Sequence, residues 1–504
     1  MDTIAKMFRT KPVAEGKEGS HGLPRVLGER DLISMGIGAI IGTGIFVLSG
    51  VAAALYAGPG IVFSFILAGI TATLAALVYS ELTAMYPVAG SAYTYTYASL
   101  GEIIAWLIGW NLVLEYTVAA AAVALGWGGY MLDLLSPVGV HLPKILTASP
   151  FSGGVINLMP ILIIVLIVYL VAAGAKESSK VNNIVVVLKL AAIALFLALG
   201  FSRFNPANWH PFLPFGTAGV LRGASVIFFA YIGFDAVATA AEEVRNPKRD
   251  LPVGIVGSLL ISTILYLGVT AVLTGMVKFN LLNTASPIST ALILRGLPWA
   301  GALVSVGALA GLTSVLLVSF FAQSRILFAM SRDGMLPPLF SKLHPRLNSP
   351  VFSILAVGVV AALLSSLLPI NLIAQLANIG TLSAFAMVSI GVIVLRHKRP
   401  DQPRPFKIPL VPYLPLLSFA ASVYLMTNLP VLTWYRFAAW LAIGLIIYFT
   451  YGIKHSRLAV SNAGDRRSGS RARRPLIPQP AYKPMPETGQ NSGARSPNES
   501  KKNE

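Results

Sequence analysis

Four glycines crowd into nine residues of an apolar segment, the run GIGAIIGTGIF at 36–46: Gly36, Gly38, Gly42 and Gly44. Each glycine costs a helix about 1 kcal/mol relative to alanine, so the cluster favours an interruption of the helix. An interruption in an apolar environment frees backbone N–H groups, which must then meet protein, water or a ligand. Free N–H groups at the start of a helix suit an anion such as a carboxylate. The alternative is a close helix–helix contact, which small residues at this spacing also permit.

A second interruption is predicted in FFAYIGFDA at 228–236, where Gly233 and Asp235 lie deep in an apolar run. The alternative is a simple glycine kink beside a hydrogen-bonded Asp235 that faces the protein interior. The two glycine-containing runs fall in the first helices of two predicted halves of five helices each. Paired interruptions at matching positions of two halves are the best sequence indication of a transporter's binding site.

Lys189 lies inside the apolar run NIVVVLKLAAIALF with no carboxylate near it in the sequence. Only about eight residues, roughly 12 Å of helix, separate it from Lys180, so its stem could reach the membrane surface. The functional alternative is a desolvated amine that loads and releases a proton. The residues alone leave both alternatives open.

Two carboxylates are also placed in apolar surroundings. Glu115, in the run WNLVLEYTVAAA, lies in the middle of the third apolar stretch. An unpaired carboxylate is costly there, so it is expected to face a cavity or a partner, or to carry a proton. Glu81 ends the second apolar stretch and is predicted to be an interfacial residue only.

The segment YPVAGSAYTYTYASLG at 86–101 links the second and third apolar stretches and carries no basic residue. It contains tyrosines at 93, 95 and 97. Aromatic side chains of this kind gather at membrane surfaces. We expect an interfacial belt or a plug at this point.

The composition requires a membrane-spanning protein. Of 504 residues, 55% are hydrophobic and 12% are charged. That charged fraction is about half the share usual in soluble domains. A bilayer core needs about 20 apolar residues for each helix, which predicts an all-α integral membrane protein with twelve transmembrane helices. The predicted stretches are 32–56, 60–85, 102–134, 157–175, 181–202, 217–241, 252–277, 299–330, 351–368, 371–395, 412–429 and 431–453.

Loop charge predicts the orientation in the membrane. The loops expected on one side hold Lys176, Lys180, Arg245, Lys248, Arg249, Arg332, Lys342, Arg346, Arg396, Lys398, Arg399, Arg404 and Lys407, whereas the other side holds only Lys144, Arg203, Lys278, Arg295 and Arg436. By the positive-inside rule the basic side and both termini are cytoplasmic. The expected location is the plasma (inner) membrane.

Several classes of protein are excluded or disfavoured. The chain has no cysteine, which excludes disulfides, thiolate metal sites and cysteine nucleophiles, and its six histidines form no HExxH pattern. No metal and no cofactor are therefore expected. The net charge of +18 is explained by basic loops and ends, and without RNP-type aromatics it predicts no nucleic-acid partner. The sequence shows neither the repeated filter of a channel nor the catalytic cluster of a membrane enzyme.

Three segments carry a family resemblance. The run at 36–46 resembles the first-helix signature of the amino acid–polyamine–organocation (APC) superfamily. The block FFAYIGFDAVATAAEEVRNPKRDLPVGI at 228–255 resembles the cationic amino acid transporter (CAT) branch, and QSRILFAMSRDGMLP at 323–337 is similar to that branch's exit from helix eight. The resemblance covers about 30–455, and twelve helices rather than fourteen match the shorter bacterial form.

The resemblance implies a five-plus-five inverted repeat with broken helices 1 and 6 and two extra helices. The corresponding domains are a cytoplasmic N-terminal segment 1–31, repeats 32–202 and 203–395, helices 11 and 12 in 396–455, and a disordered basic cytoplasmic tail 456–504. The resemblance implies no enzyme activity. It implies transport of an amino acid, usually together with a proton.

The resemblance also implies a substrate site at the two breaks. The substrate carboxylate would meet the N–H groups of Thr43 and Gly44, with Gly42 leading in. Its amino group would meet carbonyls at both breaks, and one aromatic residue would act as a gate. The carbonyl residues are Ile40, Phe229, Ala230 and Ile232, with Phe229 as the gate.

Three further roles follow from the resemblance. Lys189 matches the helix-five lysine of proton-coupled relatives and would be the coupling residue. Glu115 matches an acidic position on helix three that senses a cationic side chain or balances charge. Ser319 on helix eight would line the side-chain pocket and admit longer or cationic side chains, although a serine in a membrane helix often only hydrogen-bonds a backbone carbonyl.

The sequence thus predicts a proton-coupled symporter that imports neutral or cationic L-amino acids. The alternative is an exchanger of amino acids or amines without net proton movement. The expected partners are the small-molecule substrate and membrane lipid, and the sequence points to no particular protein partner.

Overall fold

The computed structural model describes residues 7–10 and 27–458, apart from 88–89, 137–138, 174, 242–243, 346 and 348. The side chains of 174–182 are also outside the described set. Most of the predicted N-terminal segment and nearly all of the predicted basic tail therefore lie outside the described residues. The described helices belong to one unit within Met1–Val460.

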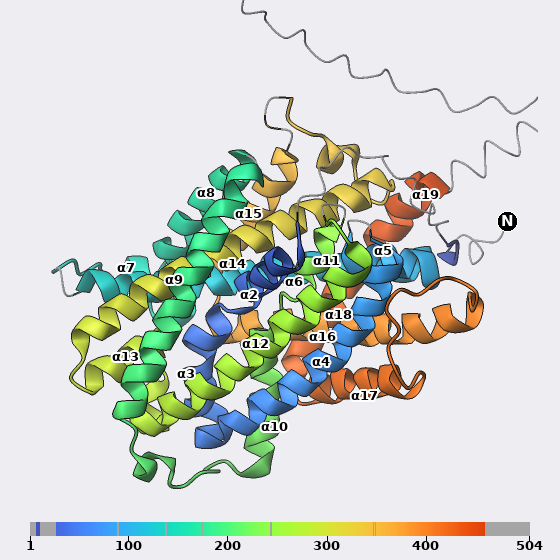
Figure 1. Ribbon diagram of the computed structural model, residues 1–504. Helices are drawn as coiled ribbons and strands as arrows, with labels where there is room; N and C mark the ends of the chain where they lie inside the picture. The colour runs from blue at the N-terminus through green and yellow to red at the C-terminus, as the bar shows by residue number, and fades with distance from the viewer. Residues whose placement is uncertain are drawn as a thin grey trace, which may run out of the picture. The chain divides into compact units, whose positions relative to one another are not determined.

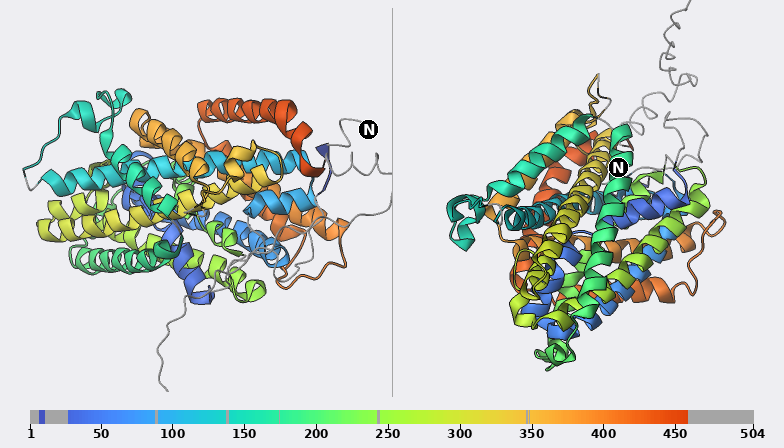
Figure 2. Two further views of the ribbon diagram at one scale, coloured as in Figure 1. Left: turned by 90° about the horizontal axis from the view of Figure 1, so that it is seen from above. Right: turned by 60° about the vertical axis from the view of Figure 1, so that its left-hand side comes forward.

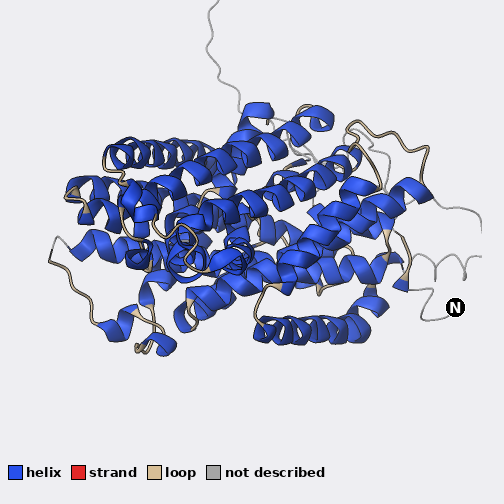
Figure 3. Ribbon diagram, turned by 90° about the horizontal axis from the view of Figure 1, so that it is seen from below, coloured by secondary structure: helices blue, strands red, loops and turns tan. Residues whose placement is uncertain are grey.

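The described residues form helices joined by loops and include no strand, and Figure 3 shows them as blue helices and tan loops only. In the first half the helices are α2 (Glu29–Ile40), a π-helical turn Gly44–Leu48, α3 (Ser49–Ala52), a second π-helical turn Ala53–Ala57, a 3₁₀ turn Gly58–Gly60, α4 (Ile61–Met85), α5 (Ser91–Ser99), α6 (Glu102–Leu135), α7 (Lys144–Thr147), a 3₁₀ turn Pro150–Ser152, α8 (Leu158–Ala173) and α9 (Ala175–Ser202).

The second half is built in the same way, with short turns between long helices. It contains a 3₁₀ turn Pro206–Trp209, α10 (Gly216–Ile227), a 3₁₀ turn Phe228–Tyr231, α11 (Ala236–Thr239), α12 (Pro247–Met276), a 3₁₀ turn Phe279–Leu282, α13 (Pro287–Leu294), α14 (Pro298–Arg332), a 3₁₀ turn Pro338–Ser341, α15 (Val351–Leu367) and α16 (Ile370–Lys398). The chain then forms α17 (Tyr413–Thr427), α18 (Val431–Ile447), a π-helical turn Tyr448–Gly452 and α19 (Ile453–His455).

The helices are those of a membrane protein. Among the described residues, eight helical segments are long and apolar enough to cross a bilayer, and three shorter apolar helices accompany them. Each of the twelve predicted stretches contains helix. The all-α prediction is confirmed, whereas the count of twelve spans and the inverted repeat stay predictions. Large apolar side chains on the outer helices are exposed, for example Tyr169 at 70% and Tyr435 at 69%, as expected of surfaces that meet lipid.

The central helices pack through small residues. α6 packs against α14 and α16, while α12 packs against α2, α4 and α9, and Figure 1 shows α12 lying between α4 and α9. A Cβ atom at Gly36 would lie 2.2 Å from the Oγ of Ser258 on α12. The close-contact interpretation therefore holds for Gly36, even though the same glycine run also contains a break.

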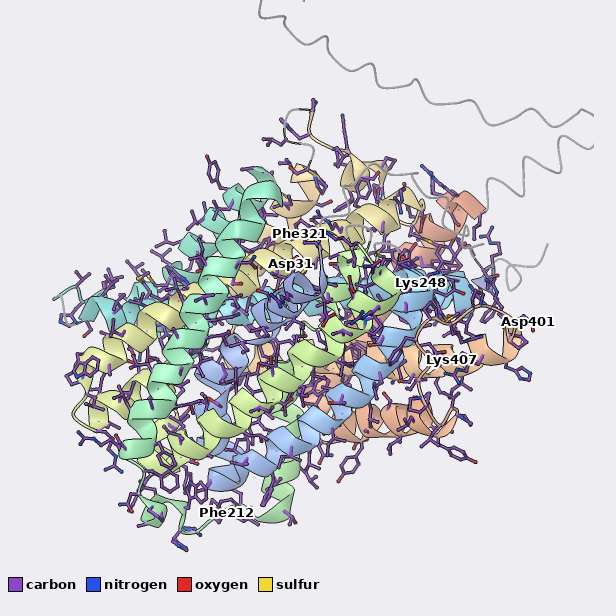
Figure 4. All side chains as sticks on the ribbon, viewed as in Figure 1. Asp31, Phe212, Lys248, Phe321, Asp401 and Lys407 are labelled. Carbon is purple, nitrogen blue, oxygen red and sulfur yellow. The ribbon has the colours of Figure 1, made fainter. Side chains whose placement is uncertain are left out.

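One end of the bundle holds basic residues such as Arg245 and Lys248 at the start of α12 and Arg332 at the end of α14, and we call it the basic end. Here α2, α6 and α12 begin and α4 and α14 end, and Figure 4 shows Asp31 and Lys248 at this end with Phe212 at the other. Leu27 and Val244 form a parallel bridge at this end, and the backbone N–H of Arg245 donates to the Leu27 carbonyl at 2.9 Å. The starts of α2 and α12 are thus tied together.

Glu81 is a structural anchor, and the prediction that it is only an interfacial residue is wrong. Its side chain is 1% exposed, and it accepts two bonds from Arg396, Nε to Oε1 at 3.0 Å and Nη2 to Oε2 at 2.5 Å. It also accepts the backbone N–H of Ile408 at 2.9 Å. These contacts fold the loop between α16 and α17 back onto the end of α4. Sequence distance hid this pairing, because the partners lie more than 300 residues apart.

We expect Glu81→Gln to lower the stability of the protein. The substitution leaves the Arg396 guanidinium without its counter-charge, and breaking a buried ion pair in this way costs on the order of 3 kcal/mol. Thermal unfolding of the detergent-solubilised protein measures the change. The matched control is Asp401→Asn, an exposed carboxylate on the same loop (Figure 4), which should leave the midpoint unchanged. Equal midpoints for the two variants would contradict the anchoring role.

Candidate substrate-binding site

The first predicted interruption is present. α2 ends at Ile40, and Ile41 is extended, with φ −78° and ψ 97°. The helix that resumes after Gly42 uses the Gly42 carbonyl as its first acceptor, for the N–H groups of Ile45 at 3.2 Å and Phe46 at 3.1 Å. The amides of Thr43 and Gly44 come before these donors, so they have no acceptor within their own helix. This is the arrangement that the glycine cluster predicts.

The second predicted interruption is present as well. After α10 the chain passes through one 3₁₀ turn to Ile232, which is extended with φ −63° and ψ 137°. Gly233 has φ +117°, in the region that favours glycine, and a Cβ there would lie 2.9 Å from the Ala39 carbonyl oxygen. α11 begins only at Ala236. The break between α10 and α11 therefore lies directly against the end of α2.

The two breaks lie face to face. A Cβ at Gly44 would be 2.3 Å from the Cα of Ala230, so only glycine allows this approach. Tyr266 on α12 joins the breaks, because its hydroxyl lies 2.8 Å from the Ile40 carbonyl and 2.6 Å from the Ala230 carbonyl. One hydroxyl has one proton and can donate to only one of them at a time.

A cavity opens between the breaks and the helices α6 and α14. It is lined by Ala39, Ile40, Gly42, Thr43, Gly44, Tyr116, Ala119, Val123, Phe229, Ile232, Gly233, Ala236, Val315, Val318 and Ser319. Seven of the eight residues predicted to bind substrate are among them. The eighth, Ala230, lies behind the lining and offers its carbonyl to Tyr266.

The cavity has a polar and an apolar side. At the first break, the Thr43 hydroxyl is buried and has no hydrogen-bond partner within the described chain. Such a group is costly unless water or a ligand satisfies it. The α6 and α14 walls are mostly small or branched apolar residues, among them Val123, Val315 and Val318, with Tyr116 and Ser319 as their polar members. No charged side chain is part of this described lining.

Lys189 is turned into the protein. It is fully buried, and its Nζ donates to the carbonyls of Gly38 at 2.8 Å and Ile41 at 3.0 Å. Both acceptors belong to the C-terminal end of α2, where the helix dipole favours a cation. The alternative of a lysine that reaches out to the membrane surface is therefore wrong, and the amine is hydrogen-bonded to the backbone of the first break.

Glu115 does not line the cavity. It is fully buried, neither carboxylate oxygen makes a hydrogen bond within the described chain, and Thr381 and Asp235 lie near it. Asp235 is buried beside the second break and accepts the Tyr116 hydroxyl at 2.7 Å. Its interior, hydrogen-bonded position agrees with the alternative stated for that residue. The role of Glu115 in sensing a substrate charge stays a prediction.

Tyr116 and Tyr266 belong to the site but were not predicted. Each is a single hydroxyl in an apolar stretch, next to Glu115 in one case and within LLISTILYLGV in the other. A buried tyrosine hydroxyl usually finds a partner, so its presence in mid-membrane is a usable signal. The partner of such a hydroxyl cannot be read from the sequence, because the carbonyls near the Tyr266 hydroxyl come from two other parts of the chain.

Paired helix breaks around a small cavity in an all-helical membrane bundle define a secondary transporter. The chain matches the family described as "Amino acid permease" over residues 27–449 and belongs to this family, within the APC superfamily. It is therefore an integral, multi-pass membrane protein of amino acid transport rather than an enzyme.

Curated relatives support the same assignment. The chain is 47% identical to the "Branched-chain amino acid permease BcaP" of Bacillus subtilis, over 90% of this chain and 99% of the relative. It is 45% identical to the "Methylthioribose transporter" of the same organism, over 90% of this chain and all of the relative. It is also 40% identical to the "Cationic amino acid transporter 4, vacuolar" of Arabidopsis thaliana, over 76% of this chain and 65% of the relative. The predicted resemblance to the superfamily and to its cationic branch is confirmed.

Proposed function

We propose that the protein is a proton-coupled symporter that imports L-amino acids, chiefly neutral ones with aliphatic side chains. The observation that carries the proposal is that the fully buried Lys189 donates hydrogen bonds to two carbonyls at the break after α2. This bonding joins a group that can change charge to the backbone that would hold the substrate. The basic end would face the cytoplasm, in keeping with the positive-inside rule.

The backbone of the breaks suits a zwitterion. The amides of Thr43 and Gly44, together with the Thr43 hydroxyl, would bind the carboxylate at a helix start. The carbonyls of Ile40, Phe229, Ala230 and Ile232 would bind the ammonium group. Tyr266 donates to one of the Ile40 and Ala230 carbonyls at a time, and even the one that accepts it has a second lone pair for another donor. The Phe229 side chain would close over the bound substrate.

The walls of the cavity favour an uncharged, branched side chain. Val123, Val315 and Val318 offer apolar contact, and no acidic residue among the described lining would neutralise an ammonium or guanidinium group. The relative named as a branched-chain amino acid permease shares 47% identity, which supports the same preference. Recognition of a cationic side chain would require Glu115 to turn toward the cavity.

Proton coupling would work through the bonds of Lys189. A charged amine holds the Gly38 and Ile41 carbonyls with charge-assisted bonds, which are about twice as strong as neutral ones. Loss of its proton would weaken the hold of α9 on the end of α2. Substrate release and proton release would then both follow from movement of the same half-helix.

Uptake into proteoliposomes tests the proposal. With an imposed pH gradient, acid outside, labelled leucine should accumulate, arginine should accumulate less, and a sodium gradient should have no effect. Accumulation driven by sodium and indifferent to pH would contradict proton coupling. Counterflow of leucine that ignores the pH gradient would instead support the exchanger.

We expect Ser319→Leu to shrink the range of substrates. Ser319 lines the wall of the cavity that would receive the substrate side chain, and a leucine there fills that space. Uptake of leucine should fall by about 5- to 150-fold, which corresponds to about 1–3 kcal/mol of overpacking, while uptake of alanine stays close to normal. Ser324→Ala, on the same helix but outside the lining, is the control. An equal loss of alanine and leucine uptake would exclude a side-chain pocket at this position.

A further inference from the structure

Glu102 gathers four donors from separate parts of the chain at the basic end. It begins α6, is fully buried, and accepts the Arg9 guanidinium at 3.2 Å and the Tyr97 hydroxyl of α5 at 2.9 Å. It also accepts the Tyr448 hydroxyl at 3.1 Å and the Ser456 hydroxyl at 2.7 Å, both from the end of the last helix. One carboxylate thus holds the N-terminal segment, α5 and the C-terminal end of the bundle together.

Arg9 brings the counter-charge to this cluster. Its side chain is only 9% exposed, and the remaining donors to Glu102 are neutral hydroxyls. Removing the cation from a buried carboxylate is strongly destabilising. Segment 7–10 therefore stabilises the cluster by holding the Arg9 charge beside Glu102. Figure 2 shows this segment, in dark blue, beside the red end of α19.

Gly101 gives a second, independent reason for the position of residues 7–10. Gly101 has φ +106°, and a Cβ there would lie 2.9 Å from the Cα of Phe8 and 3.0 Å from its carbonyl oxygen. The backbone of residue 8 therefore rests in a space that any larger residue at 101 would fill. Two unrelated features, an ion pair and a steric cradle, hold the segment in place.

The segment holds α5 at the basic end. α5 carries the tyrosines that suggested a belt or a plug, and their burial excludes a belt that faces lipid. Tyr93 donates to Asp333 at the end of α14 at 3.0 Å, Tyr95 donates to Thr83 of α4 at 3.3 Å, and Tyr97 donates to Glu102. α5 also contacts α11, the half-helix that leads from the cavity to the basic end.

We propose that residues 7–10 form a strap that locks α5 as a plug between the cavity and the basic end. With the Arg9–Glu102 pair closed, the plug is tied to α4, α6, α14 and the end of the last helix, and the basic end is shut. Release of Arg9 frees the plug, and the cavity opens toward this end. The proposal rests on the proposed function, because it treats the cavity as the substrate site.

Cysteine labelling tests the strap, because the natural chain contains no cysteine. The reporter is Ala236→Cys, which lines the cavity at the first residue of α11, and its rate of reaction with a bulky maleimide measures opening. In this background, Arg9→Gln removes the charge of the strap, and Gly101→Val fills its cradle. The control is Lys454→Gln, an exposed basic residue at the same end.

Both strap variants should raise the labelling rate about tenfold or more, the expected effect of losing one charge-assisted bond, and the control should not. Arg9→Gln keeps three hydroxyl donors on Glu102, and thermal unfolding of each sample shows whether the variant is folded before its rate is compared. An unchanged rate in folded Arg9→Gln and Gly101→Val proteins overturns the strap. Leucine binding to the protein with Ala236 intact is measured in parallel: a raised labelling rate in the strap variants, without any amino acid binding by that protein, would leave the strap standing and contradict the proposed function instead.

Discussion

Proteoliposomes that contain Lys189→Met should fail to concentrate leucine under a pH gradient. A gradient of one pH unit, coupled one proton to one substrate, sustains about a tenfold concentration ratio, and the variant should reach a ratio of about one. The reason is the position of the amine, fully buried and bonded to the Gly38 and Ile41 carbonyls. Methionine fills the same space but can neither hold a proton nor donate to those carbonyls.

The variant must be shown to be folded before the loss is interpreted. Two carbonyls without their donor cost about 1–3 kcal/mol each, which lowers the unfolding temperature, and thermal unfolding of the purified variant checks that the fold is kept. Leu188→Met is the matched control, since the neighbouring side chain is half exposed on the outer face of the same helix. Substrate exchange by Lys189→Met should persist while accumulation is lost. A variant that still accumulates leucine against its gradient would remove Lys189 from the coupling mechanism.

Gly44→Ala should weaken substrate binding strongly while the protein remains folded. The added Cβ would lie 2.3 Å from the Cα and Cβ of Ala230, so the two breaks must move apart. Overpacking of this kind costs about 1–3 kcal/mol, which corresponds to an affinity weaker by about 5- to 150-fold. Equilibrium binding of labelled leucine to the purified protein gives the measurement.

A second glycine in the membrane provides the control for Gly44. A Cβ at Gly380, on α16, would meet its nearest neighbour at 3.7 Å, an ordinary contact. Gly380→Ala should therefore bind leucine normally and be slightly more stable, because alanine favours helix. Normal binding by Gly44→Ala as well would show that the close approach of the breaks is not needed for recognition.

The interruptions could be predicted from the sequence because their cause is local. Glycine density at 36–46 and the Gly233–Asp235 pair mark weak points of helices, and neither depends on a distant partner. The same glycines also serve packing, as Gly36 shows against Ser258. Sequence alone could not divide the run between the two roles, because the neighbours of each glycine are set by tertiary structure.

Roles that depend on distant partners were missed or left open. Glu81 reads as a surface residue until Arg396 and Ile408 are seen beside it. Lys189 allowed two alternatives until its direction was known, and Tyr266 gave no hint that it touches both breaks. The buried position of α5 likewise follows from contacts with helices far along the chain. In each case the residue type was visible, whereas the partner was not.

The binding of substrate analogues tests most directly whether the two breaks capture an amino acid. Calorimetric titration of the purified protein would compare L-leucine with leucinol, which lacks the carboxylate, and with N-acetyl-leucine, which lacks the ammonium charge. We expect leucine to bind and both analogues to bind at least about 100-fold more weakly, because each leaves one set of buried backbone groups unsatisfied. If either analogue binds as tightly as leucine, the helix breaks do not recognise the charged groups of the substrate.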